Sequence, residues 1–173
     1  GGNGFCSAVS YNPRKSQPTE NYKFFYTGSV QYFTIPPATP LDGTIQIMTF
    51  KCWGGGGGGA KISDLTNQAD RELLSKGGGG AFAQISVLVQ PGDKFSILIG
   101  SGGQPCAGDK GGAGGYGFGA RGGNGIHGGG GGGGGLSMIS RSEEIVLIAG
   151  GGGGAGSTDY CCAGGGAGGG EGR

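Results

Sequence analysis

The sequence predicts a mainly β protein: a β-sandwich of short strands whose ends carry packed polyglycine helices. Glycine supplies 50 of the 173 residues, but there are only seven prolines and no strict Gly-X-Y period, so a collagen helix is excluded. Apolar stretches rich in β-forming residues interrupt the glycine, and such stretches argue against a flexible linker. The glycine tracts also begin and end where these stretches do, and 173 residues are enough for one domain.

The apolar stretches alternate inward and outward residues as half-buried strands do. "GSVQYFTIPP" ends at a proline pair, with Val30, Tyr32 and Thr34 predicted on the face opposite Phe33 and Ile35. The other predicted strands lie in "GTIQIMTFKCW" (43–53), in "AFAQISVLVQPGDKFSILIG" (81–100), and in "LSMIS" and "EIVLIAG", which form a hairpin around "RSEE".

Residues 81–100 are the clearest unit, two strands joined by "QPGD". Pro91-Gly92 predicts a type II turn, because Gly92 is free to take a positive φ. Two sets of side chains are predicted to share a face of each strand: Ala83, Ile85, Val87 and Val89 in the first, and Phe95, Ile97 and Ile99 in the second.

The glycine tracts are predicted to be core material. Glycine loses more conformational freedom than any other residue on ordering, so ordered tracts need compensating bonds. Extended three-residue-per-turn helices have no internal hydrogen bonds, and several side by side can satisfy one another's backbone groups. At a rise of ~3.1 Å, Gly128–Gly135 would span ~25 Å. The tracts are Gly54–Gly59, Gly77–Gly80, Gly111–Gly119, Gly122–Gly135, Gly150–Gly156 and Gly164–Gly170.

Two segments differ from this pattern. Residues 1–22 are polar and turn-rich and are predicted to form an N-terminal arm before a single glycine-rich domain over 23–173. Within that domain, "KISDLTNQADRELLSK" (61–76) places Leu65, Ala69 and Leu73 at a four-residue spacing, which predicts one short inserted helix.

Charge and cysteine content limit which binding partners and which cellular compartment are expected. Charged residues make up 13% and the formal net charge is +1, which argues against nucleic acid or a membrane surface as the main partner. No apolar run is long enough to span a membrane. Five cysteines without a C-x-x-C pair favour disulfides in an extracellular or cell-surface setting. The disulfide candidates, with their pairing left open, are Cys6, Cys52, Cys106, Cys161 and Cys162.

Three long stretches carry a family resemblance: "GSVQYFTIPP…GTIQIMTFKCWGGGGGGA", "GGGGAFAQISVLVQPGDKFSILIGSGG" and "GGGGGGGGLSMISRSEEIVLIAGGGGGAG". Their order resembles the glycine-rich domain family, which includes the extracellular glycine-rich domain of the anaplastic lymphoma kinase and leukocyte tyrosine kinase receptors. Related-looking domains occur in bacterial, phage and protist surface proteins. The resemblance covers about residues 26–170 and implies a jelly-roll-like sandwich with packed polyglycine-II helices outside the cell. It transfers no ligand-binding residue.

Catalytic chemistry is not predicted, and neither a cofactor nor a metal is expected. Gly117, Gly119 and Gly122 spell G-x-G-x-x-G, but glycine lies on both sides where a nucleotide site needs a strand and a helix. His127, the one histidine, interrupts a glycine tract and has no recognisable nucleophile partner. Glu143 and Glu144 are interpreted as solvated turn residues, so the chain is predicted not to be an enzyme.

The function predicted first is structural: a disulfide-containing extracellular module that assembles with copies of itself or forms part of a longer surface fibre or appendage. An exposed aromatic edge would join subunits by strand addition, although the same residues could instead be core. These assembly candidates are Phe24, Phe25, Tyr26, Tyr32 and Phe33. The alternative is an adhesin-like or receptor-type recognition module that binds a glycan or protein through "SGGQPCAGDK", residues 61–76 and "STDYCC".

Overall fold

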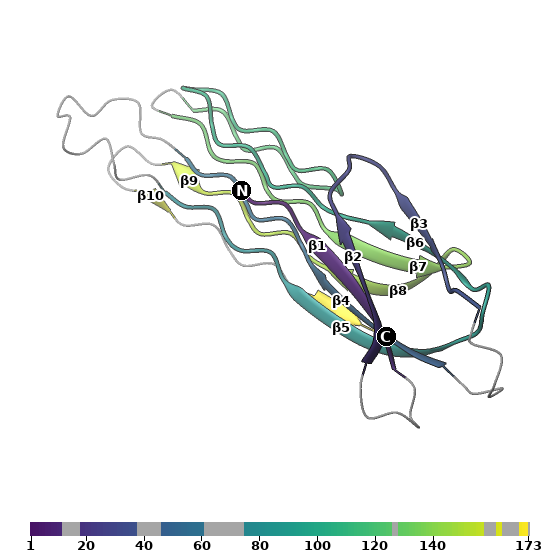
Figure 1. Ribbon diagram of the computed structural model, residues 1–173. Coiled ribbons are helices and arrows are strands. Elements are labelled where there is room, and N and C mark those ends of the chain that lie inside the picture. Colours follow the sequence, from purple (N-terminus) through teal and green to yellow (C-terminus); the bar gives the residue numbers. More distant parts are fainter. Residues whose placement is uncertain are drawn as a thin grey trace.

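Two antiparallel β-sheets form the body of the protein in a computed structural model, and they face each other across one apolar core (Figure 1). The structure describes residues 1–11, 18–37, 46–60, 75–125, 128–157, 162–163 and 170–172, and these residues contain no helix. The mainly β prediction is therefore confirmed. Most of the predicted helix over 61–76 lies outside the described residues.

The strands are short, as the alternating patterns predict. They are β1 (Phe5–Tyr11), β2 (Pro18–Phe25), β3 (Gln31–Thr34), β4 (Gln46–Trp53), β5 (Phe82–Val89), β6 (Lys94–Leu98), β7 (Ser137–Arg141), β8 (Glu144–Ala149), β9 (Gly156–Ser157), β10 (Cys162–Ala163) and β11 (Gly170–Gly172). One sheet has the order β2-β1-β4-β5, the other has the order β11-β8-β7-β6-β3, and β9 pairs with β10.

The faces predicted for the strands agree with the observed burial. Phe95, Ile97 and Ile99 are buried, as are Ala83 and Val89, whereas Tyr32 and Leu88 are exposed. Phe50 of β4 and Phe95 of β6 meet between the sheets with ring centroids 4.8 Å apart. Alternation therefore decides which side chains fill the core.

Residues 1–22, predicted as an N-terminal arm, include a strand inside the sheet. β1 pairs with both β2 and β4. Cys6, Ala8 and Ser10 point inward and are buried, while Phe5 and Val9 alternate with them and remain partly accessible. The polar turn signals around "NPRKSQ" (12–17) obscured this alternation in the sequence, although it is clear over 5–10.

The two predicted turns connect different arrangements of strands: one joins strands of the same sheet and the other joins strands of different sheets. Ser142 and Glu143 have positive φ angles of 48° and 69° between β7 and β8, so the hairpin around "RSEE" is confirmed. Gly92 has the expected positive φ of 88°, and the Asp93 N–H donates to the Gln90 carbonyl. However, β5 and β6 on either side of this turn belong to different sheets, so the chain crosses the core there.

Glycine-rich segments, which include residues 1–4 and 100–103 besides the tracts defined above, continue six strands at one end of the body. They precede β1, β5 and β7 and follow β4, β6 and β8, and antiparallel order brings all six of these strand ends to the same side. Figure 1 shows the tracts running side by side away from the strands, so the molecule is elongated. The tracts from both sheets merge into one block, because without side chains the backbones can approach closely.

Hydrogen bonds within this block repeat every three residues. The N–H groups of Gly54, Gly57 and Ala60 donate to the 75–81 segment, at Ala81, Gly78 and Ser75 respectively. Those of Gly55 and Gly58 donate to a different neighbour, at Gly135 and Gly132, with N···O distances of 2.8 and 2.7 Å. The N–H groups of successive residues thus bond to different neighbouring segments. In a β-strand, by contrast, the hydrogen-bond partners lie on two opposite sides in one plane.

Candidate functional site: a glycine block and an exposed aromatic row

The segment 128–136 lies at the centre of the glycine block. Its amides donate in rotation to three neighbouring segments: Gly131 to Ala155, Gly132 to Gln104 and Gly133 to Ala120, over N···O distances of 2.7 to 2.9 Å. The same rotation continues at Gly134 and Gly135, which donate to Gly152 and Ser101. Two further segments, 54–60 and 111–115, donate to its carbonyl groups. The segment therefore has bonded neighbours on five sides.

Side chains are excluded from most of this block. A Cβ built on Gly131 would lie 2.0 Å from the Gly58 carbonyl oxygen, and one on Gly132 would lie 2.0 Å from that of Ala113. Atoms cannot approach so closely, so these positions require glycine. Gly133 differs, because its nearest neighbour would be 3.5 Å away.

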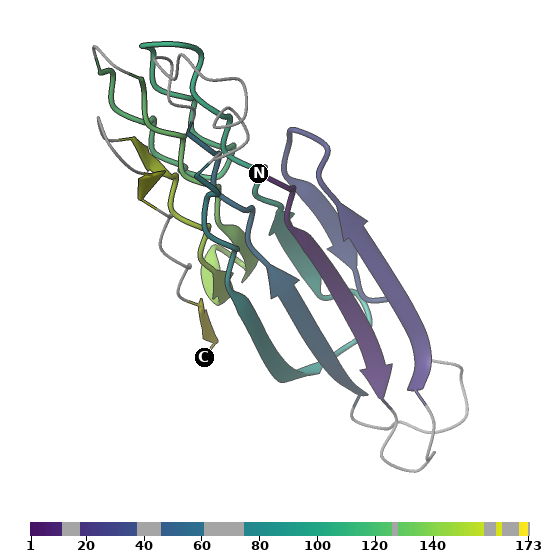
Figure 2. The same cartoon turned by 90° about the vertical axis from the view of Figure 1, so that its left-hand side faces the viewer.

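A row of four aromatic rings crosses the outer face of the four-stranded sheet. Phe25, Phe5, Trp53 and Phe82 come from the four strands β2, β1, β4 and β5 and face one another in register. The ring centroids of successive pairs are 5.2, 5.7 and 4.8 Å apart. The exposed fractions of Phe25, Trp53 and Phe82 are 63, 38 and 50%. Figure 2 shows this sheet in front of the other, with its outer face toward the viewer.

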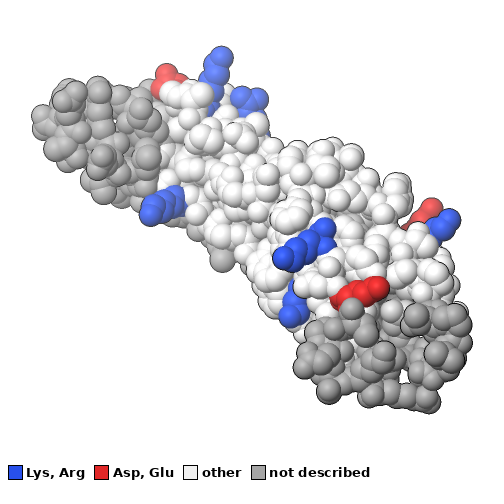
Figure 3. All heavy atoms as spheres, viewed as in Figure 1, with Lys and Arg blue, Asp and Glu red and all other residues white. Residues whose placement is uncertain are grey.

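The next row along the same outer face is polar and basic. Ser7 lies opposite both Lys23 and Lys51, and Lys51 lies opposite Gln84. Among the described residues neither lysine has a carboxylate within ion-pair distance. Charged side chains are sparse on the side of the molecule that Figure 3 shows.

The predicted assembly residues separate into two groups. Phe24 and Phe33 pack edge to face at 5.4 Å, and Tyr26 contacts Tyr116 with ring centroids 6.0 Å apart, so these three are partly buried. Only Phe25 and Tyr32 are strongly exposed, at 63 and 81%. β2 and β3, which carry them, are each an edge strand of their sheet.

Of the aromatic row, only Phe25 was predicted from the sequence as a candidate residue. Phe5, Trp53 and Phe82 are separated by long stretches of chain, and only the strand register brings them together. The sequence does contain one signal for the row, which is that its members lie next to glycine. Phe5 follows Gly4, Trp53 precedes Gly54, and only Ala81 separates Phe82 from the 77–80 tract. Each therefore marks the end of a strand at the boundary of the glycine block.

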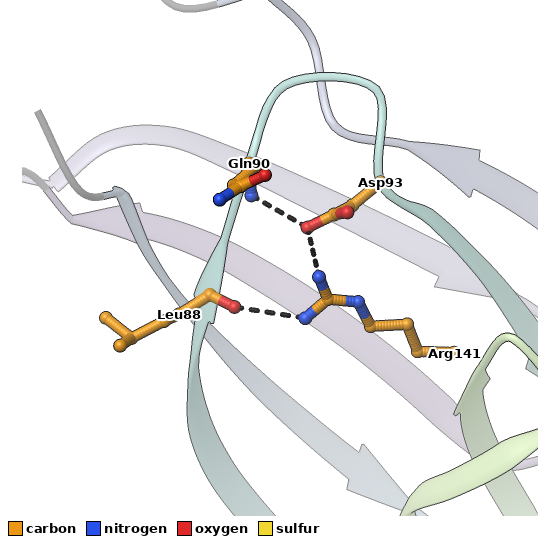
Figure 4. Close-up of polar contacts among 4 residues, drawn as sticks. All are labelled: Leu88, Gln90, Asp93 and Arg141. Carbon is orange, nitrogen blue, oxygen red and sulfur yellow. Dashed lines mark hydrogen bonds and ion pairs between the residues drawn. The ribbon is translucent and has the colours of Figure 1, made fainter. Parts of the chain in front are cut away.

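Arg141 connects the β7–β8 hairpin to the turn between β5 and β6 (Figure 4). Its guanidinium donates to the Leu88 carbonyl at 3.2 Å and to Asp93 Oδ2 at 2.7 Å, and Asp93 Oδ2 also accepts the Gln90 N–H. A cavity of about 440 Å³ lies beside it, lined by Val87, Phe95, Arg141, Ser142, Glu144, Ile145 and Val146. Because the guanidinium is already paired, we interpret this group as a clamp between sheets.

Among the residues that the structure describes, Tyr22 carries the one clear pKa shift. Burial raises the pKa of Tyr22 to about 12, and the hydrogen bond and the negative charge of Glu20 add to the effect. The Tyr22 hydroxyl donates to Glu20 Oε2, and its ring packs on Phe33 at 4.7 Å. The first contact is within β2 and the second joins β2 to β3, so the shift reflects local packing.

The cysteine candidates have different outcomes. Cys6 and Cys52 face each other across β1 and β4 and form a disulfide whose two residues are fully buried. Cys106 is half-buried where its N–H donates to the Gly59 carbonyl. Cys161 lies outside the described residues, and only the backbone of Cys162, in β10, is described.

The residues weighed for catalysis do not gather into a site. Glu143 and Glu144 are exposed in the β7–β8 turn, while His127 lies outside the described residues. Gly117 and Phe118 form a tight turn with positive φ angles of 87° and 66°, without a following helix in the described chain. The described part of the chain also contains no cluster of three or more metal-ligating side chains, and no helix there is long and apolar enough to cross a membrane.

Comparison with protein-family models, with curated proteins and with solved structures found no match to this chain.

Proposed function

We propose that this protein is an extracellular structural module in which polyglycine-II helices extend a jelly-roll-like sandwich into a stiff block. The observation that carries the proposal is the three-residue rotation of hydrogen-bond partners along 128–136. Helices with three residues per turn direct each successive amide to another neighbour, as these do. Crossovers of the chain between the two sheets, as at the β5–β6 turn, support the jelly-roll-like arrangement.

The block suits a mechanical role because backbone bonds alone hold it. Segments that are far apart in the sequence, such as 54–60 and 128–136, are bonded to one another directly. Bending the block would break several such bonds at once, and buried backbone groups left unpaired are costly. Few side chains project from the tracts, so the block offers little for catalysis and the module is proposed not to be an enzyme.

The proposed setting is the cell surface or the extracellular space. The Cys6–Cys52 disulfide supports it, because disulfides persist in oxidising compartments. The resemblance to the glycine-rich domain family points to the same setting. Neighbouring domains of a longer surface protein, or copies of this chain, are the proposed partners.

Assembly would use the β2 and β3 edges, where Phe25 and Tyr32 are exposed. Sedimentation velocity over a range of concentrations, with electron microscopy of the same samples, tests this. The wild-type chain should associate, and Tyr32→Ser should reduce association. Ile145→Ser is the matched control, since Ile145 is 47% exposed but lies on β8, which has strand neighbours on both sides. A strictly monomeric wild-type chain in physiological buffer would remove the assembly proposal.

A recognition module remains the alternative function. Of the loops that would carry binding, 101–110 is described, and it ends in a turn closed by the Ala107 and Lys110 backbones. Replacing Asp109 and Lys110 with serine should abolish binding to a surface ligand if this alternative holds, and should leave the thermal transition unchanged. An unaltered binding profile would leave the structural role as the better account.

A further inference from the structure

We infer that the outer face of the β2-β1-β4-β5 sheet is a docking surface for a linear acidic polysaccharide. The sugar rings would stack on the row Phe25, Phe5, Trp53 and Phe82, and the acidic groups would meet Lys23 and Lys51. This goes beyond the structural role proposed above and does not depend on self-assembly.

The shape of the row favours a chain of rings. One aromatic side chain per strand gives a straight line across the sheet, and strands repeat at ~4.8 Å, which is close to the length of one pyranose unit in an extended chain. Three of the four rings are at least 38% exposed. Exposed aromatic surface of this kind is costly in water and marks interaction sites.

The adjacent row supplies the charge preference. Residues two apart on a strand lie ~7 Å apart on the same face, so the Lys23 and Lys51 side chains can reach substituents of a polymer lying on the aromatic rings. The four strand positions of this row are occupied by Ser7, Lys23, Lys51 and Gln84, with no acidic residue. The face is therefore complementary to carboxylate or sulfate groups, and the exposed Gln84 offers an amide partner for sugar hydroxyls, whereas Ser7 is only 8% exposed.

A peptide fits this face less well. Peptides usually add to a sheet edge, lie as a helix in a groove or dock in a proline-binding slot. The row runs across the sheet at the ends of its strands, and its two central members lie on β1 and β4, which already have strand neighbours on both sides. A polymer of stiff rings can lie flat on such a face and loses little conformational entropy on binding.

Binding of alginate to the full chain tests the inference, measured by isothermal titration calorimetry at two salt concentrations. Alginate should bind, and its affinity should fall as salt rises. Carboxyl-reduced alginate, which keeps the rings, and poly-glutamate, which keeps the charge, should each bind at least about tenfold more weakly. Trp53→Ala and the double variant Lys23→Gln/Lys51→Gln should each weaken alginate binding by about tenfold or more.

Leu88→Ala is the matched control, because Leu88 is 61% exposed on the same outer face but lies at the far end of β5. It should bind like the wild type. The lysine double variant alters an exposed and a half-buried polar position outside the core, so it keeps the test valid if Trp53→Ala lowers the unfolding temperature. Three results would overturn the inference: no alginate binding, poly-glutamate binding as tightly as alginate, or equal losses for Leu88→Ala.

Discussion

Gly134 lies so close to the Gly55 carbonyl group that Gly134 could not carry a side chain, and Gly55 is blocked in the same way by a third segment, at Ser101. A Cβ on Gly134 would lie 2.0 Å from the Gly55 carbonyl oxygen, and one on Gly55 would lie 2.2 Å from that of Ser101. The two residues belong to segments that continue strands of different sheets, β7 and β4. Close contact between glycine backbones is therefore what joins the two sheets at this end.

Gly134→Ala should destabilise the protein by several kcal/mol, about 3 or more, because the added methyl group forces the 54–60 and 128–136 segments apart. Chemical denaturation of the variant measures this.

Gly133→Ala is its matched control, one residue away in the same segment. Its Cβ would have its nearest neighbour, the Ala120 amide nitrogen, at an ordinary 3.5 Å. Its stability should stay within about 0.5 kcal/mol of wild type, or rise, because alanine restricts the unfolded chain. Equal effects of the two substitutions would contradict the close packing of the tracts.

Removing the disulfide with Cys6→Ala/Cys52→Ala should lower the free energy of unfolding by about 2–4 kcal/mol. The bond closes a loop with a sequence separation of 46 residues, which limits the freedom of the unfolded chain. Thermal unfolding of the double variant in non-reducing buffer gives the comparison. A transition temperature equal to that of wild type would show that the disulfide does not stabilise the protein.

Arg141→Lys should cost about 1 kcal/mol, because a lysine ammonium cannot reproduce the fork that reaches both the Leu88 carbonyl and Asp93. The value is small because the Arg141 side chain is 38% exposed and solvent screens the ion pair. A double-mutant cycle with Asp93→Asn isolates the interaction. The coupling should shrink at high salt, and a coupling of zero at low salt would rule out the clamp.

Alkaline stability should depend on Tyr22. Its pKa in the folded protein is raised to about 12 from 10.0, so the folded state holds the phenol proton more tightly than the unfolded state does. The resulting stabilisation is fully present below about pH 10 and is lost as the pH rises through about 12. Ultraviolet titration of tyrosinate should show one late phenol that is absent in Tyr22→Phe and titrates earlier in Glu20→Gln. An unchanged titration in Glu20→Gln would exclude that carboxylate as a cause.

Local pattern was enough to predict the strands from β3 to β8, but not β1, which lies in the segment predicted as an arm. The alternation of Ala83 to Val89 and the positive φ of Gly92 follow from residue types within a few positions, and both agree with the structure. The partner of Cys6 was not predictable, because it depends on the register of β1 against β4, two strands far apart in the chain.

The candidate surfaces were harder to predict for the same reason. Glycine tracts have no side-chain pattern, so the sequence does not indicate which tract bonds to which. The aromatic row depends on the register of three strand pairs, and of its members only Phe25 had been singled out as an assembly residue. Whether the predicted edge residues mediate assembly stays a prediction.

Amide hydrogen exchange along 131–135 tests the central claim, that the glycine tracts are ordered core, most directly. Each of these five amides donates to a carbonyl in another segment at 2.7 to 2.9 Å, so their exchange should be slowed as much as that of β7 and β8 amides. Gly79 and Gly123, whose amides have no acceptor in the described part of the chain, should exchange fast. Exchange of 131–135 at the rate of an unstructured glycine chain would contradict the account.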